Sequence, residues 1–129
     1  MEIEYGSEVR EQIFRQLWAT LSPSIGYLTG ERQENKIIIQ GIFMPKEWAG
    51  KPHVLDCSDL EKAIKAREPG KSIVGIAAYM GQWNAQEEFG PVRKSRQHLK
   101  EKGYPDISLQ IEEMGDYKFY SAEQYKLNI

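Results

Sequence analysis

Hydrophobic and polar residues alternate along this chain with two different periods, which predict helices and strands in turn. From Ser7 to Leu21, apolar residues recur at steps of three and four, the spacing that places them on one face of a helix. The stretch from Ser58 to Arg67 begins with serine and glutamate at capping-box spacing. A third stretch, Pro91 to Lys102, begins with a proline suited to the first helical position and ends before Gly103. The pattern therefore predicts three helices.

The segments between these helices are short and rich in β-branched and aromatic residues, which predicts strands. The polar run from Gly30 to Asn35 is typical of a hairpin turn, and the tail after Tyr120 is expected to add a short strand or a turn. The expected strands are Ile25–Thr29, Lys36–Met44, Ser72–Gly81, Ile107–Ile111 and Tyr117–Tyr120.

The strand from Ser72 to Gly81 is the centre of the predicted fold. Its apolar residues follow one another without alternation, around Gly75, which indicates a strand covered on both faces. The residues at its end, Ala78, Tyr79 and Met80, are then expected at the carboxyl edge of the sheet. Open α/β folds bind ligands at that edge, so a functional site is expected there.

The order of elements predicts an α/β fold with a mixed central sheet of about five to six strands, flanked by helices on both faces. The third and fourth strands are joined through a helix and should run parallel, while the flanking hairpins should be antiparallel. The 129 residues fit one domain, residues 1–129.

Composition narrows the class of protein. Seventeen basic against nineteen acidic residues give a net charge of −2, which provides no general attraction to nucleic acid or to an anionic membrane. No apolar run approaches the roughly 20 residues of a membrane span, and the first ten residues are acidic and polar, unlike a signal peptide. The single cysteine excludes an internal disulfide. These features predict a cytoplasmic protein.

Several phrases of the sequence resemble the JAMM/MPN domain, the fold of zinc-dependent isopeptidases that act on ubiquitin-like conjugates. Ile25–Gly30 is similar to the first strand of that family, Asn35–Pro45 to its second, and Ile73–Ala77 to the strand that leads into its zinc motif. Tyr104–Ile107 and the hairpin through Gly115 fit its later strands. The resemblance covers most of the chain and implies a cytidine-deaminase-like architecture.

The positions that carry the chemistry of this family depart from it. Ala78 and Met80 stand where the family has two zinc-binding histidines, and Gly81 replaces the following proline. The catalytic glutamate of the family falls on Pro23, and no S-x-x-D motif is present near Glu88–Pro91. A catalytic zinc needs three protein ligands and a carboxylate that accepts a proton from its water. The resemblance therefore implies a metal-free member without cofactor, which is more consistent with a pseudoenzyme than with a hydrolase.

The loop after the central strand combines a large aromatic ring with several amide side chains, the composition of a binding surface. In the alternative interpretation, Trp83 and Phe89 fold back and fill the space of the missing metal site. The residues expected to line a binding cleft are Ala78, Tyr79, Met80, Gln82, Trp83, Asn84 and Gln86.

Other candidate residues have a structural interpretation beside the functional one. Glu87 and Glu88 could act as acid and base or remain solvated. His53 and Cys57 have a spacing that suits a nucleophile and its base, but a cysteine at a helix start is more often a small buried residue. His98 is interpreted as a solvated helix residue.

The third predicted helix carries a run of cations, interpreted as a solvated face because the chain as a whole is acidic. The sequence does not determine whether Trp18, Trp48 and Trp83 belong to the core or to a contact surface. The cations are Arg93, Lys94, Arg96, Lys100 and Lys102.

The expected function is that of an interaction or scaffold module. By resemblance, its partner is another JAMM-type domain, a second copy of this chain in a homodimer, or a ubiquitin-like protein. The alternative is a hydrolase that uses the same cleft without zinc, with Glu87 or Glu88 as base and Tyr79 or Asn84 positioning the substrate. A small-molecule sensor that binds beside Trp83 is a third hypothesis.

Overall fold

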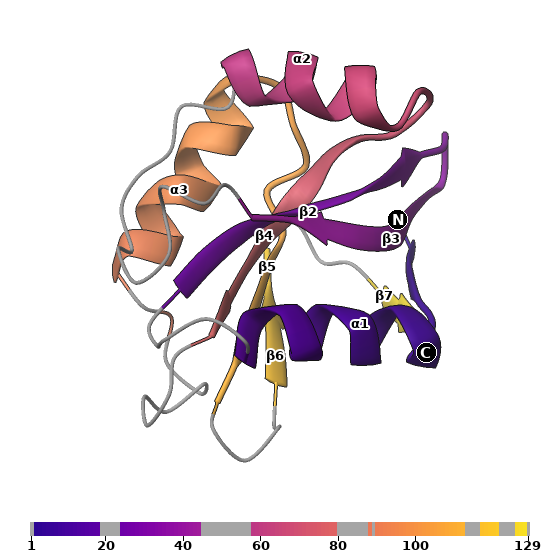
Figure 1. Cartoon of the computed structure of the whole chain (residues 1–129). Helices are drawn as coiled ribbons and strands as arrows, with labels where there is room; N and C mark the ends of the chain where they lie inside the picture. The colour runs from indigo at the N-terminus through magenta and orange to yellow at the C-terminus, as the bar shows by residue number, and fades with distance from the viewer. Residues whose placement is uncertain are drawn as a thin grey trace.

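A computed structural model describes residues 2–18, 24–44, 58–79, 88, 90–112, 117–121 and 126–128. Three helices and seven strands are present in these ranges (Figure 1). The helices are α1 (Ser7–Trp18), α2 (Ser58–Arg67) and α3 (Gly90–Glu101). The strands are β1 (Glu2–Tyr5), β2 (Ser24–Arg32), β3 (Lys36–Phe43), β4 (Ser72–Tyr79), β5 (Ser108–Ile111), β6 (Tyr117–Tyr120) and β7 (Lys126–Asn128).

All seven strands form one mixed sheet in the order β6-β5-β4-β2-β3-β1-β7. The parallel pairing of β4 with β5 across the α3 connection is confirmed, as are the antiparallel β2–β3 and β5–β6 pairs. Every residue from Ile73 to Ala78 is buried, so β4 is covered on both faces, as its unbroken apolar run predicts. The α/β class with a mixed sheet is therefore confirmed.

The sheet has one strand beyond the predicted five to six, because the amino-terminal segment forms β1. Its acidic composition conceals an alternating pattern in which Ile3 and Tyr5 are 2% and 1% exposed. Glu4 lies between them and pairs with Lys36 at 3.0 Å. Four residues are enough because β1 lies between β3 and β7 and bonds to both in parallel.

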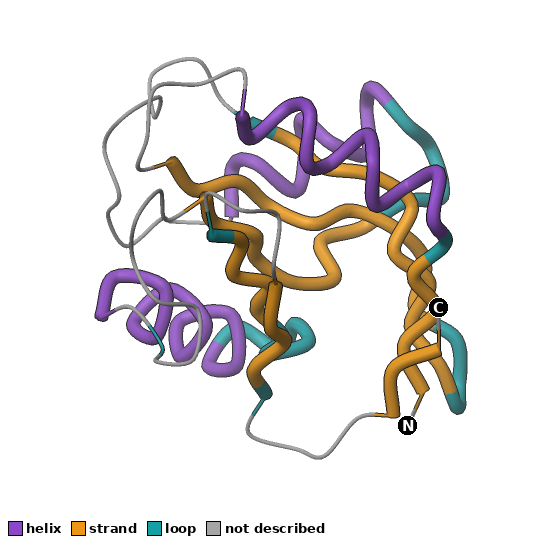
Figure 2. Tube along the Cα trace, turned by 90° about the horizontal axis from the view of Figure 1, so that it is seen from below, coloured by secondary structure: helices purple, strands orange, loops and turns teal. Residues whose placement is uncertain are grey.

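The helices cover both faces of the sheet, as expected (Figures 1 and 2). Ile13 and Leu17 of α1 belong to a core cluster with Leu28, Leu109 and other strand residues on one face. On the other face, Ile64 of α2 joins the cluster that contains Val92 and Leu99 of α3. These two layers are called the α1-side core and the α3-side core below.

Most predicted boundaries hold to within one or two residues where the structure describes them. The predicted turn at 30–35 is too long, since β2 continues to Arg32 and pairs there with Ile37. The turn is closed by a hydrogen bond from Gln33 N to Lys36 O of 2.8 Å. Helix α1 is described to Trp18, and the three further predicted residues lie outside the described ranges.

Two β-bulges flank β2 at the same level and bend the sheet there. On one side, Thr29 and Gly30 pair with Gly41 and Ile39, so Gln40 is the extra residue of β3. On the other side, Leu28 and Thr29 pair with Gly75 and Ile73 of β4. The bulge at Gln40 shifts the alternation of β3 by one residue. As a result, Ile37 and Ile39 before it and Ile42 and Met44 after it all belong to the α1-side core.

The carboxylate of Glu61 ties α2 to the start of β4. It accepts hydrogen bonds from Ser72 Oγ (2.8 Å) and from the backbone N of Ile73 (3.3 Å), and it forms an ion pair with Lys65 at 3.4 Å. The predicted capping box involves Ser58, whose side chain lies outside the described part. The described contacts of Glu61 instead satisfy a backbone donor at the entry of the central strand.

Candidate functional site

The carboxyl ends of β4 and β5 meet at one edge of the sheet, where a site was expected. Tyr79 and Ile111 are register partners at this edge. Ala78 is fully buried in the α3-side core, whereas Tyr79 is half-buried against the α1-side core. The two residues therefore point to opposite faces of the sheet.

Of the residues predicted to line the cleft, the structure describes only Ala78 and Tyr79, with Glu88 from the alternative catalytic pair. The positions of Pro23, Trp48, His53 and Cys57 also lie outside the described ranges, and Trp18 is described in its backbone only. The remaining predicted site residues outside these ranges are Met80, Gln82, Trp83, Asn84, Gln86 and Glu87.

Strand β5 carries two buried polar residues that the sequence reasoning missed. Gln110 is the register partner of Ala78 and Ser108 that of Ile76, and both are completely buried. The intervening Leu109 belongs to the α1-side core. The signal is the strict alternation of polar and apolar residues in β5, which places a polar pair on the face that α3 covers.

Glu88 lies just before α3 and is held by two arginines of that helix. Its Oε2 is 3.2 Å from Arg96 Nη2 and 3.5 Å from Arg93 Nε, and its side chain is only 9% exposed. Its second oxygen, Oε1, is buried and has no hydrogen-bond partner among the described residues. The Arg96 side chain is 16% exposed, so this cation of the basic run is not solvated, whereas Arg93, at 64%, is.

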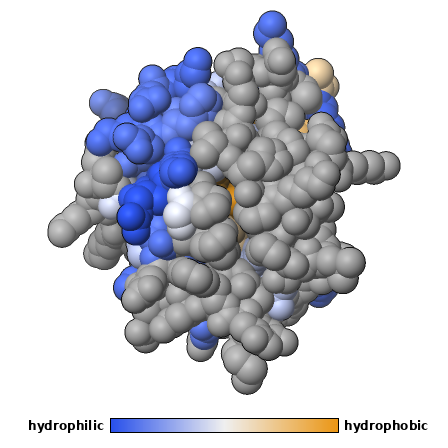
Figure 3. Space-filling view, turned by 90° about the vertical axis from the view of Figure 1, so that its left-hand side faces the viewer, coloured by the Kyte–Doolittle hydropathy of each residue, from blue (hydrophilic) through white to orange (hydrophobic). Residues whose placement is uncertain are grey.

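The outward face of α3 borders a groove of about 580 Å³ that carries charges of both signs. Figure 3 shows that the described residues on this side of the molecule are predominantly hydrophilic. The cations along the groove are opposed by Glu101 and by Asp106, which is 6% exposed. Three cations against two acidic side chains leave this groove with an excess of one positive charge. The groove is lined by Arg93, Arg96, Gln97, Lys100, Glu101 and Asp106.

His98 differs from its expected solvated state. It is half-buried, and its Nε2 is buried without a hydrogen-bond partner in the described part of the chain. The described residues contain no group of three or more histidine, cysteine, aspartate or glutamate side chains that could hold a metal ion.

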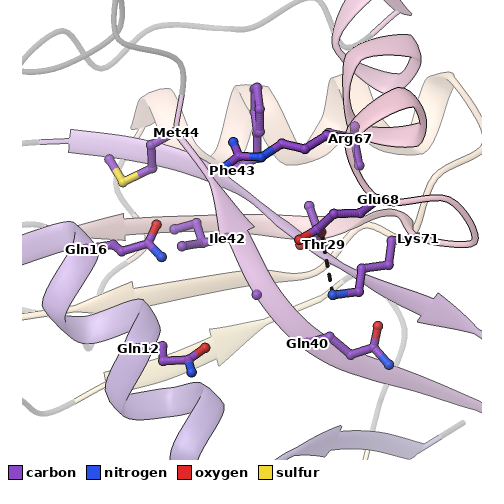
Figure 4. Close-up of a pocket in the computed structure, with 12 residues that line it drawn as sticks. Gln12, Gln16, Thr29, Gln40, Ile42, Phe43, Met44, Arg67, Glu68 and Lys71 are labelled. Atoms are coloured by element: carbon purple, nitrogen blue, oxygen red, sulfur yellow. Dashed lines mark ion pairs between the residues drawn. The ribbon is translucent and has the colours of Figure 1, made fainter.

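A second cavity, of about 310 Å³, lies along β3 between α1 and the end of α2 (Figure 4). Sequence reasoning did not identify it, because its residues come from five separate segments. Three glutamine amides and three charged side chains give it a polar character. The lining residues are Gln12, Gln16, Thr29, Gln40, Gly41, Ile42, Phe43, Met44, Ile64, Arg67, Glu68 and Lys71.

This fold is the JAB1/MPN fold. The chain superposes on the crystal structure of a JAB1/MPN domain protein from Archaeoglobus fulgidus with a TM-score of 0.61 and 9% sequence identity, and the match covers 100% of both chains. No family model and no curated protein matches the sequence. The resemblance recognised in the sequence is therefore confirmed at the level of the fold. None of the described helices has the length and apolar character of a membrane span.

Proposed function

We propose that this chain is an MPN-fold interaction module and that it does not use the zinc hydrolysis of the catalytic family. The observation that carries the proposal is the state of Ala78. By resemblance this residue occupies the position of the first zinc-binding histidine, and its methyl group is fully buried in the α3-side core. It offers no donor atom to a metal.

Gln110 and Glu88 do not fit a zinc ion either. A catalytic zinc is held by imidazole, thiolate or carboxylate groups, with one position open to water. Gln110, beside Ala78, presents a carboxamide and is fully buried. The Oε2 of Glu88 is engaged by two guanidinium groups. These residues therefore support no reaction step through a metal.

The proposed partner is a protein. The resemblance implies another JAMM-type domain, a second copy of this chain, or a ubiquitin-like protein, in the cytoplasm. The support is the fold, which the chain shares over its whole length with a JAB1/MPN domain protein. A scaffold of this kind uses its surface and needs no open catalytic centre.

The decisive experiment measures the metal content of the purified protein and its titration with zinc by calorimetry. Metal well below one equivalent and no zinc binding would support the proposal. One tightly bound zinc per chain would contradict the reasoning at Ala78. Light scattering on a sizing column, alone and with a ubiquitin-like protein, then measures self-association and complex formation.

The alternative hydrolase is tested in parallel with a fluorogenic ubiquitin-like conjugate in the presence of a chelator. Turnover that persists with the chelator and disappears in Glu88→Gln would establish the zinc-free hydrolase instead. The proposal expects no turnover above the background of buffer.

A further inference from the structure

We propose that the edge of β3 at Gln40–Phe43 is a docking groove for an extended acidic segment of a partner protein, which adds a strand beside β3. The inference deepens the proposed interaction function and rests on it, since it names how one partner is held. The groove is the 310 Å³ cavity between α1 and the end of α2, defined by the lining residues given above.

Among the described strands, only β1 pairs with the outer side of β3, and it covers the first half of β3. Strand β1 pairs with Lys36–Ile39 and ends at Tyr5; the chain then passes through Gly6 into α1. Strand β3 continues to Phe43, and Gly41–Phe43 pair regularly with β2 on the inner side. In the described part of the chain, no strand pairs with the outer side of Gln40–Phe43. A strand placed there would continue the line of β1 and bond to the backbone of β3.

The β3 residues that line the groove, Gln40–Phe43, and Met44 after them are all half-buried. Ile42 packs into the α1-side core, and Phe43 packs into the α3-side core on the opposite face. Gly41, which lies between Gln40 and Ile42, has no side chain. Figure 4 shows Gln12 and Gln16 of α1 on one side of β3 and Arg67 on the other. The two helices therefore form walls on opposite faces of the strand.

Gln40 provides a hydrogen-bond acceptor that needs a donor. It is the bulged residue of β3 and lines the groove, and its Oε1 is buried without a partner among the described residues. A buried carbonyl oxygen without a donor costs about 1 to 3 kcal/mol. A turn of the Gln40 side chain would bring this oxygen to the backbone N–H of an added strand, and the amides of Gln12 and Gln16 can bond to the polar side chains of that strand.

The charges around the groove favour an acidic segment. Lys71 pairs with Glu68 at 3.5 Å, whereas Arg67 is exposed and forms no ion pair with a described residue. The lining thus has an excess of one positive charge in a chain of net charge −2. No residue from Gln40 to Met44 is charged, so this edge lacks the lysines that usually prevent strand addition.

The test is a titration of the ¹⁵N-labelled protein with acetylated and amidated octapeptides, followed by NMR. One peptide alternates valine with glutamate, and its control alternates valine with lysine. We expect saturable shifts at the backbone amides of 40–43 and at the Gln40 side-chain amide with the acidic peptide. Its affinity should exceed that of the basic peptide by about fivefold, the effect of one exposed ion pair.

Two further peptides test for strand pairing. Each is the acidic octapeptide with alternate backbone amides methylated, in one register or the other. An added strand turns every second amide toward its neighbour, so one version should lose binding and the other should keep it. Equal binding of both versions, or the absence of shifts at 40–43, would overturn the proposal.

A pair of charge reversals on α2 completes the experiment. Arg67→Glu changes the groove, while Lys62→Glu changes an exposed residue of the same helix that does not line it. We expect Arg67→Glu to weaken the acidic peptide about fivefold and Lys62→Glu to leave it unchanged. Equal effects of the two variants would refute the groove. If the peptides do not bind and the protein shows neither zinc binding nor turnover, the groove is refuted but the interaction module is not. Bound zinc would contradict the interaction module itself.

Discussion

The rings of Tyr5 and Phe119 meet edge to face, with centroids 5.3 Å apart and planes at 83°, although they lie on strands near opposite ends of the sheet. Phe119 is on β6, at one end of the strand order, and Tyr5 is on β1, next to the other end. Tyr117 of β6 adds a contact to Tyr5 at 6.1 Å and one to Phe14 of α1 at 5.9 Å. The sheet therefore curls around α1 and closes the α1-side core with aromatic rings.

This closure predicts that Tyr5 and Phe119 are energetically coupled. In a double-mutant cycle of Tyr5→Leu and Phe119→Leu, we expect a coupling of about 0.5 to 1.5 kcal/mol in the free energy of unfolding, the range of edge-to-face pairs. Urea denaturation of the four proteins measures it. Additive effects would show that the two ends of the sheet do not support one another.

Tyr5 also predicts how stability depends on alkaline pH. Burial raises the pKa of its phenol well above the usual value of about 10, and Tyr117 raises it further, while Arg10 lowers it. As the pH rises, the unfolded chain therefore loses this proton before the folded protein does. The contribution of Tyr5 to the free energy of unfolding is complete below about pH 10, and it decreases above that pH by about 1.4 kcal/mol per pH unit. Tyr5→Phe should remove this part of the decline.

The comparison is between unfolding free energies at pH 7 and pH 11, with Tyr120→Phe as a half-buried control. At pH 7, Tyr5→Phe should change stability by less than about 1 kcal/mol, since the hydroxyl has no hydrogen-bond partner among the described residues. If the stability of Tyr5→Phe declines between the two pH values as steeply as that of the parent protein, the alkaline loss does not come from Tyr5.

The elements that could be predicted are those whose pattern is local. Helix α2 and strand β6 have the predicted bounds, because caps, turns and periodicity act over a few residues. Strand β1 could not be predicted, because its stability comes from Ile3 and Tyr5 entering a core made by residues far along the chain. The bulge at Gln40 likewise depends on register between strands, which the period of one strand does not reveal.

The edge of the sheet where β4 and β5 end was easier to predict than the side chains that lie there. The unbroken apolar run of β4 identified the edge at Ala78 and Tyr79. Two parallel strands joined through a helix end at the same edge of a sheet, so this position follows from the order of elements. The ion pairs of Glu88 with Arg93 and Arg96, and the burial of Gln110 beside Ala78, depend on how α3 and β5 lie on the sheet. Such contacts depend on how whole elements pack and have no signature in sequence spacing.

Gly30 is expected to be irreplaceable in the hairpin of β2 and β3. A Cβ at this position would overlap the carbonyl oxygen of Ile38, which belongs to the backbone and cannot move without breaking the pairing. Gly30→Ala should therefore cost about 3 kcal/mol of unfolding free energy, as a local clash in a packed sheet does. Thermal and urea denaturation measure the loss.

The matched control is Gly41→Ala, on the neighbouring strand. A Cβ there would lie 3.4 Å from Thr29 Oγ1, an ordinary contact, so the change should stay within about 1 kcal/mol. Similar losses in the two variants would mean that the effect of Gly30→Ala comes from general strand propensity and not from the close approach at the bulge.

The two arginines that hold Glu88 should differ in their effect on stability, although both contact the same carboxylate oxygen. Arg96 is the less exposed partner at 16%, and its removal leaves Glu88, at 9% exposure, with one mostly solvated cation. Arg96→Leu should cost about 2 kcal/mol, because breaking a buried pair leaves a charge uncompensated. Arg93→Leu should cost less than about 1 kcal/mol, as exposed pairs do.

The control uses the background Glu88→Gln, in which no carboxylate is left without a partner. There the penalty of Arg96→Leu should fall by at least half. A penalty that stays the same in this background would assign the role of Arg96 to packing of its stem, and would leave the carboxylate of Glu88 available for a role in binding.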